Sequence, residues 1–216
     1  MTPARTVIFD CDSTLSAIEG IDELAVGHKA EVSRLTALAM AGTIPLEQAY
    51  AQRLELIRPS RADLDRVGRL YIEHLVPDAG HVIGTLRAAG VVVRVLSGGL
   101  APAVRIVAAH LDIPPADVAA VEVYFTELGA YAGFDASSPL ARSGGKREWI
   151  VAHASALPRP VMLVGDGVTD LEARPVIDRF VAFAGIIARP EVIRLADTIV
   201  TERSLAPVLA LALGSG

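Results

Sequence analysis

The sequence is poor in the features that cross-link a chain, anchor it in a membrane or charge it strongly. Its 216 residues include one cysteine, Cys11, so no disulfide can form within the chain and nothing ties the fold to an oxidising compartment. The net charge of -5 is small and spread out, which gives no electrostatic reason to expect a nucleic acid or an anionic membrane as partner. No apolar run is long enough to span a bilayer. We therefore expect a cytoplasmic protein, monomer or homodimer, without nucleic-acid or membrane partners.

The composition is that of a folded globular protein. Apolar residues make up 52% of the chain and charged residues 21%, which is typical of a globular rather than a disordered protein. At roughly 100–200 residues per domain, the length allows one domain or two.

Five short runs have the composition of β-strands. They are apolar throughout, which is typical of strands that are covered by helices on both faces. Helical patterns lie between several of them, and one of these patterns ends at Gly90, a common helix stop. This alternation predicts an α/β fold with a doubly wound parallel sheet. The predicted strands are 6–10, 91–96, 161–166, 179–185 and 197–201.

Residues 16–76 break the alternation, because they contain helical patterns and no convincing strand. Pro45 suits the start of a helix and Pro59 its stop, while Ser60 and Asp63 have the spacing of a capping box for the next helix. We predict that this segment is a helical cap, inserted after the first strand into a core formed by residues 1–15 and 77–216. A second, small insertion at 121–135 has the pattern of a β-hairpin.

Polar residues follow three of the predicted strands, where an open α/β sheet binds its ligands. Several carboxylates gathered there would repel one another and have raised pKa values unless a cation neutralises them. With no paired histidines and a single cysteine, a hard divalent ion with oxygen ligands, Mg²⁺, is the simplest expectation. The residues concerned are Asp10, Asp12, Ser13, Thr14, Ser97, Gly98, Gly99, Asp166, Gly167, Thr169 and Asp170.

A metal beside a Ser-Gly-Gly turn, whose backbone N–H groups can meet an anion, indicates a phosphate site. Lys146 follows two glycines at the head of a predicted helix and could neutralise phosphoryl oxygens. The chain has no P-loop motif. With an aspartate available as nucleophile, covalent catalysis through an aspartyl phosphate is the natural hypothesis.

The motifs "FDCDSTL", "VLSGG", Lys146 and "GDGVTD" occur in the order of the four motifs of the haloacid dehalogenase superfamily, which the chain resembles. More narrowly, "EGIDELA", "AMAGTIPLEQAYAQRLELIRPS", "AYAGFD" and "SGGK" resemble the phosphoserine phosphatase family. The resemblance covers nearly the whole chain, cap included. It implies a Mg²⁺-dependent phosphomonoesterase that releases serine from O-phosphoserine, in serine biosynthesis.

The resemblance also implies roles for the residues of the core. Asp10 would attack phosphorus, and Asp12 would protonate the departing oxygen and later activate water. The carboxylates of Asp10 and Asp166 and the main-chain carbonyl of Asp12 would hold Mg²⁺, with Asp170 supporting the metal shell or Lys146. The phosphoryl oxygens would be bound by Ser97, Gly98, Gly99 and Lys146, with Thr169 close by.

The cap would choose the substrate. Arg53 falls on the apolar stripe of its predicted helix, where an arginine needs an anion, and its planar fork suits a carboxylate. In the family, the matching residue binds the substrate carboxylate and the residue matching Glu19 binds the amino group. Met40 would shape the pocket wall, and Arg189 keeps the place of a family arginine. The chain departs from the family pattern at Leu46, Ala41 and Ile186, which leaves substrate preference open.

Each assignment has an ordinary structural alternative. Asp10 and Asp12 could cap a turn, Lys146 and Glu19 could be solvated, Arg53 could pair with a carboxylate within the cap, and Met40 could fill the core. Other functions also remain open: a phosphatase or phosphotransferase for another small phosphorylated amine or amino acid, or a receiver-like signalling domain. The latter needs neither a second acid nor a large cap.

Overall fold

The computed structural model describes residues 2–40 and 43–214. Its centre is a parallel sheet with the strand order β3-β2-β1-β6-β7-β8. From β1 the chain builds outward in one direction through β2 and β3, and later in the other through β6, β7 and β8. The order therefore reverses between β1 and β6. The strands are β1 (Thr6–Phe9), β2 (Val92–Leu100), β3 (Val118–Val121), β6 (Val161–Gly165), β7 (Arg179–Phe183) and β8 (Thr198–Val200).

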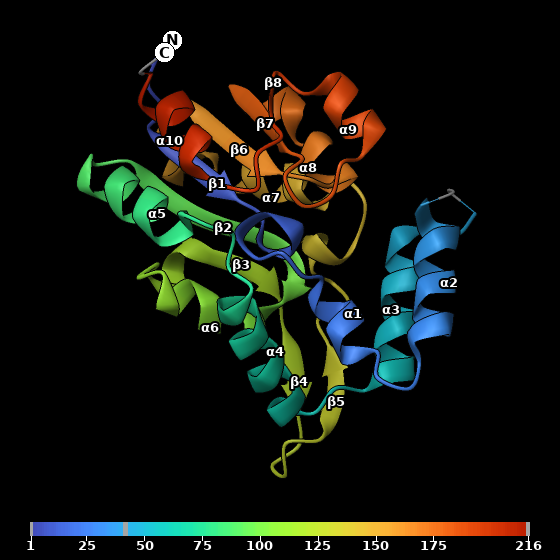
Figure 1. Ribbon diagram of the computed structural model, residues 1–216. Helices are drawn as coiled ribbons and strands as arrows, with labels where there is room; N and C mark the ends of the chain where they lie inside the picture. The colour runs from blue at the N-terminus through green and yellow to red at the C-terminus, as the bar shows by residue number, and fades with distance from the viewer. Residues whose placement is uncertain (1, 41–42, 215–216) are drawn as a thin grey trace.

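This sheet confirms the predicted α/β fold and all five predicted strands. Strand β3 was missed, because its sequence, VAAV, is short, rich in alanine and only half-buried at the sheet edge. The central strands are completely buried, as Val7, Ile8 and Phe9 of β1 illustrate. Helices flank the sheet (Figure 1). They are α5 (Ala79–Ala88), α6 (Ala101–His110), α7 (Gly145–Ala152), α8 (Val168–Leu171), α9 (Pro190–Leu195) and α10 (Ala206–Leu213).

Four helices occupy the segment that was predicted to be a cap. As expected, α3 begins after Pro45, and the capping box of Ser60 and Asp63 opens α4. Helices α2 and α3 pack as a pair, whereas α4 lies against α6 of the core (Figure 1). The helices are α1 (Gly20–Leu24), α2 (Lys29–Met40), α3 (Leu46–Ile57) and α4 (Arg61–Glu73). The division of the chain at residues 16 and 76 stays a prediction.

The predicted hairpin is present as β4 (Val123–Phe125) and β5 (Tyr131–Phe134), an antiparallel pair separate from the main sheet. It reaches the cap at two points. The rings of Phe134 and Tyr50 of α3 lie 5.4 Å apart, and the Arg61 N–H at the start of α4 donates to the Gly129 carbonyl at 2.9 Å. The hairpin thus links the core to both α3 and α4.

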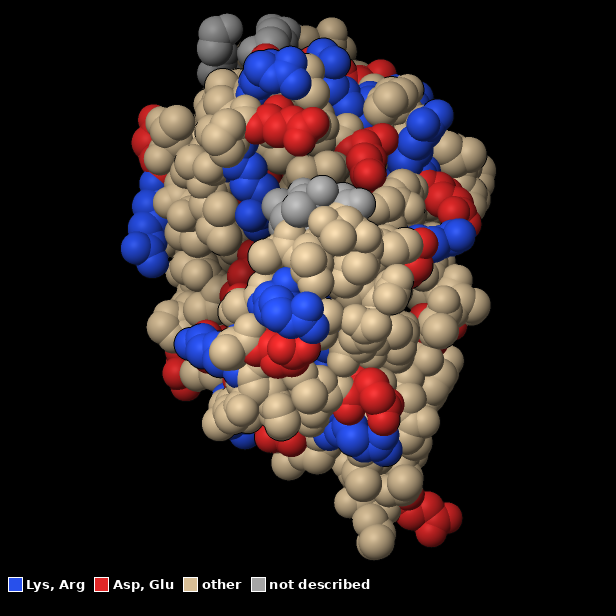
Figure 2. All heavy atoms as spheres, turned by 90° about the vertical axis from the view of Figure 1, so that its right-hand side faces the viewer, with Lys and Arg blue, Asp and Glu red and all other residues tan. Residues whose placement is uncertain are grey.

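The surface that carries α2 and α3 mixes basic and acidic side chains, and neither sign gathers into one patch on that face (Figure 2). Among residues 2–40 and 43–214, no helix combines the length and the apolar character that crossing a membrane requires.

Gly68 makes the close packing of α4 on α6 possible. A Cβ at this position would lie 2.6 Å from Ile106 Cδ1 and 2.7 Å from Ile106 Cβ. The second of these atoms cannot swing away without moving the α6 backbone. The lack of a side chain at Gly68 therefore allows α4 to approach α6 this closely.

We predict that Gly68→Ala destabilises the protein by about 1–3 kcal/mol, because an added methyl overpacks the α4–α6 contact. Gly84→Ala in α5 is the matched control, since a Cβ there meets nothing within 4 Å. The control should gain about 0.5–1 kcal/mol from the lower entropy cost of ordering alanine in a helix. Urea unfolding of both variants measures the difference, and equal free energies of unfolding would contradict the prediction.

Candidate active site

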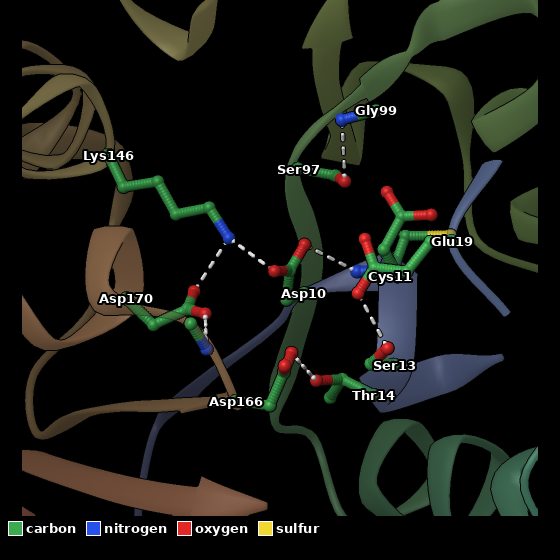
Figure 3. Close-up of polar contacts among 12 residues, drawn as sticks. Asp10, Cys11, Ser13, Thr14, Glu19, Ser97, Gly99, Lys146, Asp166 and Asp170 are labelled. Atoms are coloured by element: carbon green, nitrogen blue, oxygen red, sulfur yellow. Dashed lines mark hydrogen bonds and ion pairs between the residues drawn. The ribbon is translucent and has the colours of Figure 1, made fainter. Parts of the chain in front are cut away.

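The candidate residues meet at the carboxyl ends of β1, β6 and β2, beside the point where the strand order reverses. Asp10 follows β1 and Asp166 follows β6, and both are almost completely buried. The sequence prediction that these two strand ends converge is confirmed. Figure 3 shows Lys146 and Asp170 approaching Asp10 from one side and Ser97 lying beyond it.

The segment Cys11–Leu15 turns the chain immediately after β1. Its backbone forms one wide turn, closed by the Ser16 N–H donating to the Cys11 carbonyl at 3.0 Å. Within it Ser13 takes the left-handed conformation, with φ of 52°, and its hydroxyl donates to Glu19 at 2.7 Å. Cys11 is fully buried, and burial raises the pKa of its thiol well above the usual range. The thiol therefore belongs to the packed hydrophobic interior.

Lys146 is buried between two carboxylates. Its Nζ lies 2.7 Å from Asp10 Oδ2 and 2.6 Å from Asp170 Oδ1 (Figure 3). Burial by itself lowers the pKa of Lys146, but Asp10 and Asp170 outweigh that effect and raise the pKa, so the ammonium stays charged. The lysine is not solvated, so its ordinary surface interpretation is wrong.

The backbone requires glycine at the two positions before Lys146. Gly144 has φ of 72°, and a Cβ on Gly145 would lie 1.6 Å from the Pro139 carbonyl oxygen. Only glycine at residue 145 lets α7 begin this close to the 139–141 turn. The two glycines of "SGGK" therefore let the backbone pack tightly against the 139–141 turn, and this packing fixes the position of Lys146 at the start of α7.

Asp10, Asp166 and Asp170 form a cluster in which one oxygen from each carboxylate lies within 4.8 Å of the others. Burial, with the charges of Asp10 and Asp170, raises the pKa of Asp166 to about 8. Thr14 donates to Asp166 Oδ1 at 3.3 Å, whereas no residue in the described part of the chain donates a hydrogen bond to the buried Oδ2. An all-oxygen donor set with excess negative charge fits a hard divalent cation.

Arg189, at the start of α9, supplies a second positive charge to the cluster. One of its terminal nitrogens lies 3.0 Å from Asp166 Oδ2 and 3.5 Å from Glu19 Oε1. The contact with Asp166 is an ion pair without hydrogen-bond geometry. The structure therefore brings Arg189 and Glu19 into the site, where each faces a charged partner. Ile186 is half-buried and packs against the hydrophobic core.

The Ser97–Gly99 stretch is not a turn after β2, as the sequence had suggested. The strand continues to Leu100, with a shift of register against β3 between Leu96 and Leu100. Ser97 is fully buried, and its hydroxyl accepts the Gly99 N–H at 3.0 Å. The glycines let the strand end irregularly, and one predicted anion donor, the Gly99 N–H, is already engaged by the Ser97 hydroxyl (Figure 3).

Asp12 faces the cap. Its Oδ1 accepts the Gly20 N–H at 2.7 Å and the Tyr71 hydroxyl at 2.6 Å. Burial, together with the charges of Glu19 and Asp10, raises the pKa of Asp12 to about 7, against the lowering effect of these hydrogen bonds. The carboxyl is therefore poised to hold or release a proton near neutral pH.

Arg53 points inward from α3 without an ion pair. Its Nη1 donates to the Thr36 hydroxyl at 3.3 Å, and its Nε is buried with no hydrogen-bond partner among the described residues. No carboxylate in the described part of the chain lies within 4 Å, so a structural salt bridge is excluded there. Burial lowers the pKa of Arg53. The guanidinium also lies 5.7 Å from the Tyr50 ring centroid.

Two buried tyrosines were missed by reading the sequence. Tyr71 bonds Asp12, and the Tyr50 hydroxyl donates to the Gly98 carbonyl at 2.8 Å. Both lie on apolar stripes of cap helices, where they read as core. The available signal was chemical, because a buried tyrosine hydroxyl needs a partner.

Other predicted cap and site residues stand as follows. Thr169 lies half-buried in α8, beside Asp170. Leu46 opens α3, half-buried. Ala41 lies outside the described residues, and the Met40 side chain is likewise not described.

Comparison with known proteins agrees with this geometry. Residues 4–174 match the haloacid dehalogenase-like hydrolase family. Phosphoserine phosphatase from Bos taurus is 40% identical over 202 residues, 92% of this chain and 90% of the relative. The human phosphoserine phosphatase is 40% identical over 192 residues, 88% of this chain and 85% of the relative.

Solved structures agree as well. A phosphoserine phosphohydrolase-like protein from Francisella tularensis superposes with a TM-score of 0.84 at 25% identity, covering 97% of this chain and 100% of the other. A substrate-bound phosphoserine phosphatase complex gives a TM-score of 0.80 at 25% identity, covering 98% and 99% of the two chains. This chain is therefore an enzyme that belongs to the haloacid dehalogenase-like hydrolases and, within them, to the phosphoserine phosphatase family.

Proposed function

We propose that this enzyme hydrolyses O-phospho-L-serine to L-serine and phosphate through an aspartyl phosphate on Asp10, with Mg²⁺ as cofactor, as a step of serine biosynthesis. The observation that carries the proposal is Arg53 of the cap, a half-buried arginine that has no ion pair among the described residues and whose Nε is buried without a partner there. It offers a planar cation in a chain whose core carries a buried lysine–carboxylate site. Phosphoserine has both anions that these two features need, a carboxylate and a phosphate.

In this proposal Asp10 attacks phosphorus, and the bond from phosphorus to the serine oxygen breaks. Asp12 gives its proton to that oxygen as serine leaves. Asp12 then takes a proton from the water that attacks the phosphoaspartate, and phosphate departs. The Cys11 N–H, which donates to Asp10 Oδ1 at 2.7 Å, and Lys146 hold the attacking carboxylate in one orientation.

The charged and polar groups near Asp10 would bind the phosphoryl group and the metal ion. Lys146 and the Ser97 hydroxyl would bind its oxygens as charge develops on them. Asp10, Asp166 and the Asp12 carbonyl would hold Mg²⁺, supported by Asp170, and the bound ion supplies positive charge that offsets carboxylates and phosphate. Thr169, Gly98 and Gly99 line the same edge of the sheet.

The cap would bind the rest of the substrate. Arg53 would take the carboxylate through its fork, and Glu19 would take the ammonium group. Glu19 is already oriented by the Ser13 hydroxyl and lies 3.5 Å from Arg189, so its carboxylate is held in place before substrate arrives. Met40 and Leu46 would shape the wall of the pocket. Arg189 would act on the substrate indirectly, through its ion pair with Glu19.

The first prediction tests the nucleophile. Asp10→Asn keeps the shape of the side chain but removes the attacking charge, so phosphate release from phosphoserine should fall about 10³-fold or more. Rapid acid quench followed by intact-mass measurement should detect a phosphorylated wild-type protein and none in the variant. Glu127→Gln in the exposed hairpin turn is a control for loss of one carboxyl group. Undiminished turnover by Asp10→Asn would refute the mechanism.

The second prediction tests the role of Arg53. Arg53→Ala should lower kcat/KM for phosphoserine about 10- to 100-fold, the cost of a charged hydrogen-bonded pair. Phosphoethanolamine retains the phosphate and ammonium but lacks the carboxylate, so its kcat/KM should change little.

The control for that experiment is Arg34→Ala, which removes an exposed arginine from the neighbouring helix α2. It should leave both substrates unchanged. Equal losses on the two substrates for Arg53→Ala would show that the arginine does not read the carboxylate. A wild type that prefers another phosphorylated amine would contradict the substrate assignment and leave the phosphoryl chemistry standing.

The third prediction concerns the metal. Protein treated with a chelator should lose phosphatase activity and regain it with Mg²⁺, because the cation offsets buried carboxylates. At roughly 100 times its Kd, Mg²⁺ should raise Tm by about 5–10 °C. Asp166→Asn should abolish both effects, and NaCl of equal ionic strength should reproduce neither. Full activity after chelation would contradict the metal requirement.

A further inference from the structure

The contacts of Tyr71 in the cap point to a role in the chemistry of the core. Tyr71 lies on α4, has 1% of its surface exposed, and its hydroxyl donates to Asp12 Oδ1 at 2.6 Å. Helix α4 is the cap helix that packs on α6, with Gly68 against Ile106. The tyrosine is therefore held relative to the core by a close helix contact, and its hydroxyl reaches a carboxylate at the end of β1.

The two oxygens of Asp12 have different surroundings. Oδ1 accepts two hydrogen bonds, from the Tyr71 hydroxyl and from the Gly20 N–H at 2.7 Å. Oδ2 has no hydrogen bond among the described residues and lies beside Gly99, where a Cβ would come within 2.9 Å of it. Gly99 ends the stretch that carries Ser97 into the phosphoryl site. The free oxygen therefore lies on the side of Gly99 and the Ser97 hydroxyl, and the other oxygen is fixed on the cap side.

The position of Tyr71 requires glycine at residue 20. A Cβ on Gly20 would lie 2.0 Å from the Tyr71 hydroxyl oxygen and 2.8 Å from its ring carbon Cζ. The absence of a side chain at residue 20 thus makes room for the phenol next to the N–H that shares its acceptor. Two donors, one from α1 and one from α4, converge on a single oxygen.

We propose that Tyr71 is a positioning residue for proton transfer: with the Gly20 N–H it occupies Oδ1 of Asp12, so that Oδ2 is the oxygen that exchanges the proton with the leaving group. This inference rests on the proposed function, in which Asp12 is the acid and base. A carboxyl group whose acceptor oxygen is fixed presents its proton in one direction, which saves the entropy of orienting it during the reaction. Tyr71 acts through Asp12 and does not touch the substrate.

The test compares two leaving groups. Serine leaves as an alcohol and needs a proton, whereas p-nitrophenolate leaves as a stable anion and needs little help. We use kcat/KM, because it reports the steps up to release of the alcohol or phenolate. Tyr71→Phe keeps the ring and removes one hydrogen bond, so kcat/KM for phosphoserine should fall about tenfold. For p-nitrophenyl phosphate it should change less than about twofold, because that step needs little proton transfer.

A second variant guards against a fold artefact. Gly20→Ala places a methyl group where the Tyr71 hydroxyl lies and so displaces an intact tyrosine. It should give the same split between the two substrates. Equal losses of kcat/KM on both substrates in Tyr71→Phe and Gly20→Ala would mean that the contact is only structural. Unchanged kcat/KM in Tyr71→Phe would mean that the contact contributes nothing to the reaction. Either result overturns the proposal.

Tyr50→Phe is the matched control. It also removes a buried hydroxyl that bonds the cap to the core, at the Gly98 carbonyl, but it leaves Asp12 untouched. Any loss it causes should be equal for the two substrates. If Tyr50→Phe reproduced the split of Tyr71→Phe, the split would come from a loosened cap, and the proposal would be wrong.

Asp12→Asn separates this inference from the proposed function. If Asp12 is the acid, Asp12→Asn should lose far more on phosphoserine than on p-nitrophenyl phosphate, by about 100-fold or more. A split in Asp12→Asn without a split in Tyr71→Phe would sink the role of Tyr71 alone. No split in Asp12→Asn would sink the acid role itself, and the Tyr71 inference with it.

Discussion

A buried ammonium between two carboxylates is the interaction on which the site depends. Lys146 Nζ contacts both Asp10 and Asp170, and all three residues are buried. Removing one partner from such a group leaves an uncompensated charge in the interior, which typically costs about 3–5 kcal/mol. Burying such a group also costs desolvation energy that can exceed the attraction gained, so stability alone does not account for the arrangement. It places a fixed positive charge beside a carboxylate at the mouth of a parallel sheet, where a phosphoryl group can use it.

The rest of the fold can be understood as the support for that charge. The reversal of strand order between β1 and β6 places Asp10 and Asp166 on adjacent strand ends, as the doubly wound topology requires. Glycine at residue 145 lets α7 start close to the 139–141 turn and so delivers the lysine from a third direction. Each piece is local in sequence, but only the packed sheet brings the pieces within a few ångströms.

This division explains what could be predicted from the sequence. Apolar runs, the capping box at Ser60 and the order of polar residues after strands carry local information, and they predicted five strands, the cap helices and the convergence of Asp10 with Asp166. The path of Ser97 through an irregular strand end depends on register against β3, which no local pattern encodes. Likewise Tyr71 bonds Asp12 across 59 positions of the chain, and an apolar stripe indicates which way a side chain faces but not what it meets. Short, alanine-rich β3 lacked even the local signal.

The cap divides into two parts with different physical roles. Helix α3 carries Arg53, which bonds Thr36 of α2 and has no carboxylate partner among the described residues, so its charge is available to a ligand. Helix α4 carries Tyr71, whose hydrogen bond is satisfied within the protein, and it packs on the core through Gly68. A residue that reads the substrate must keep an unsatisfied group, at a cost in stability, whereas a residue that orients the machinery must have its own bonds complete. Under the proposed roles, a substitution on α3 would change substrate choice while α4 keeps the alignment of Asp12. Leu46, one of the three positions where this chain departs from the family pattern, opens α3, at a distance in sequence from the helix that carries Tyr71.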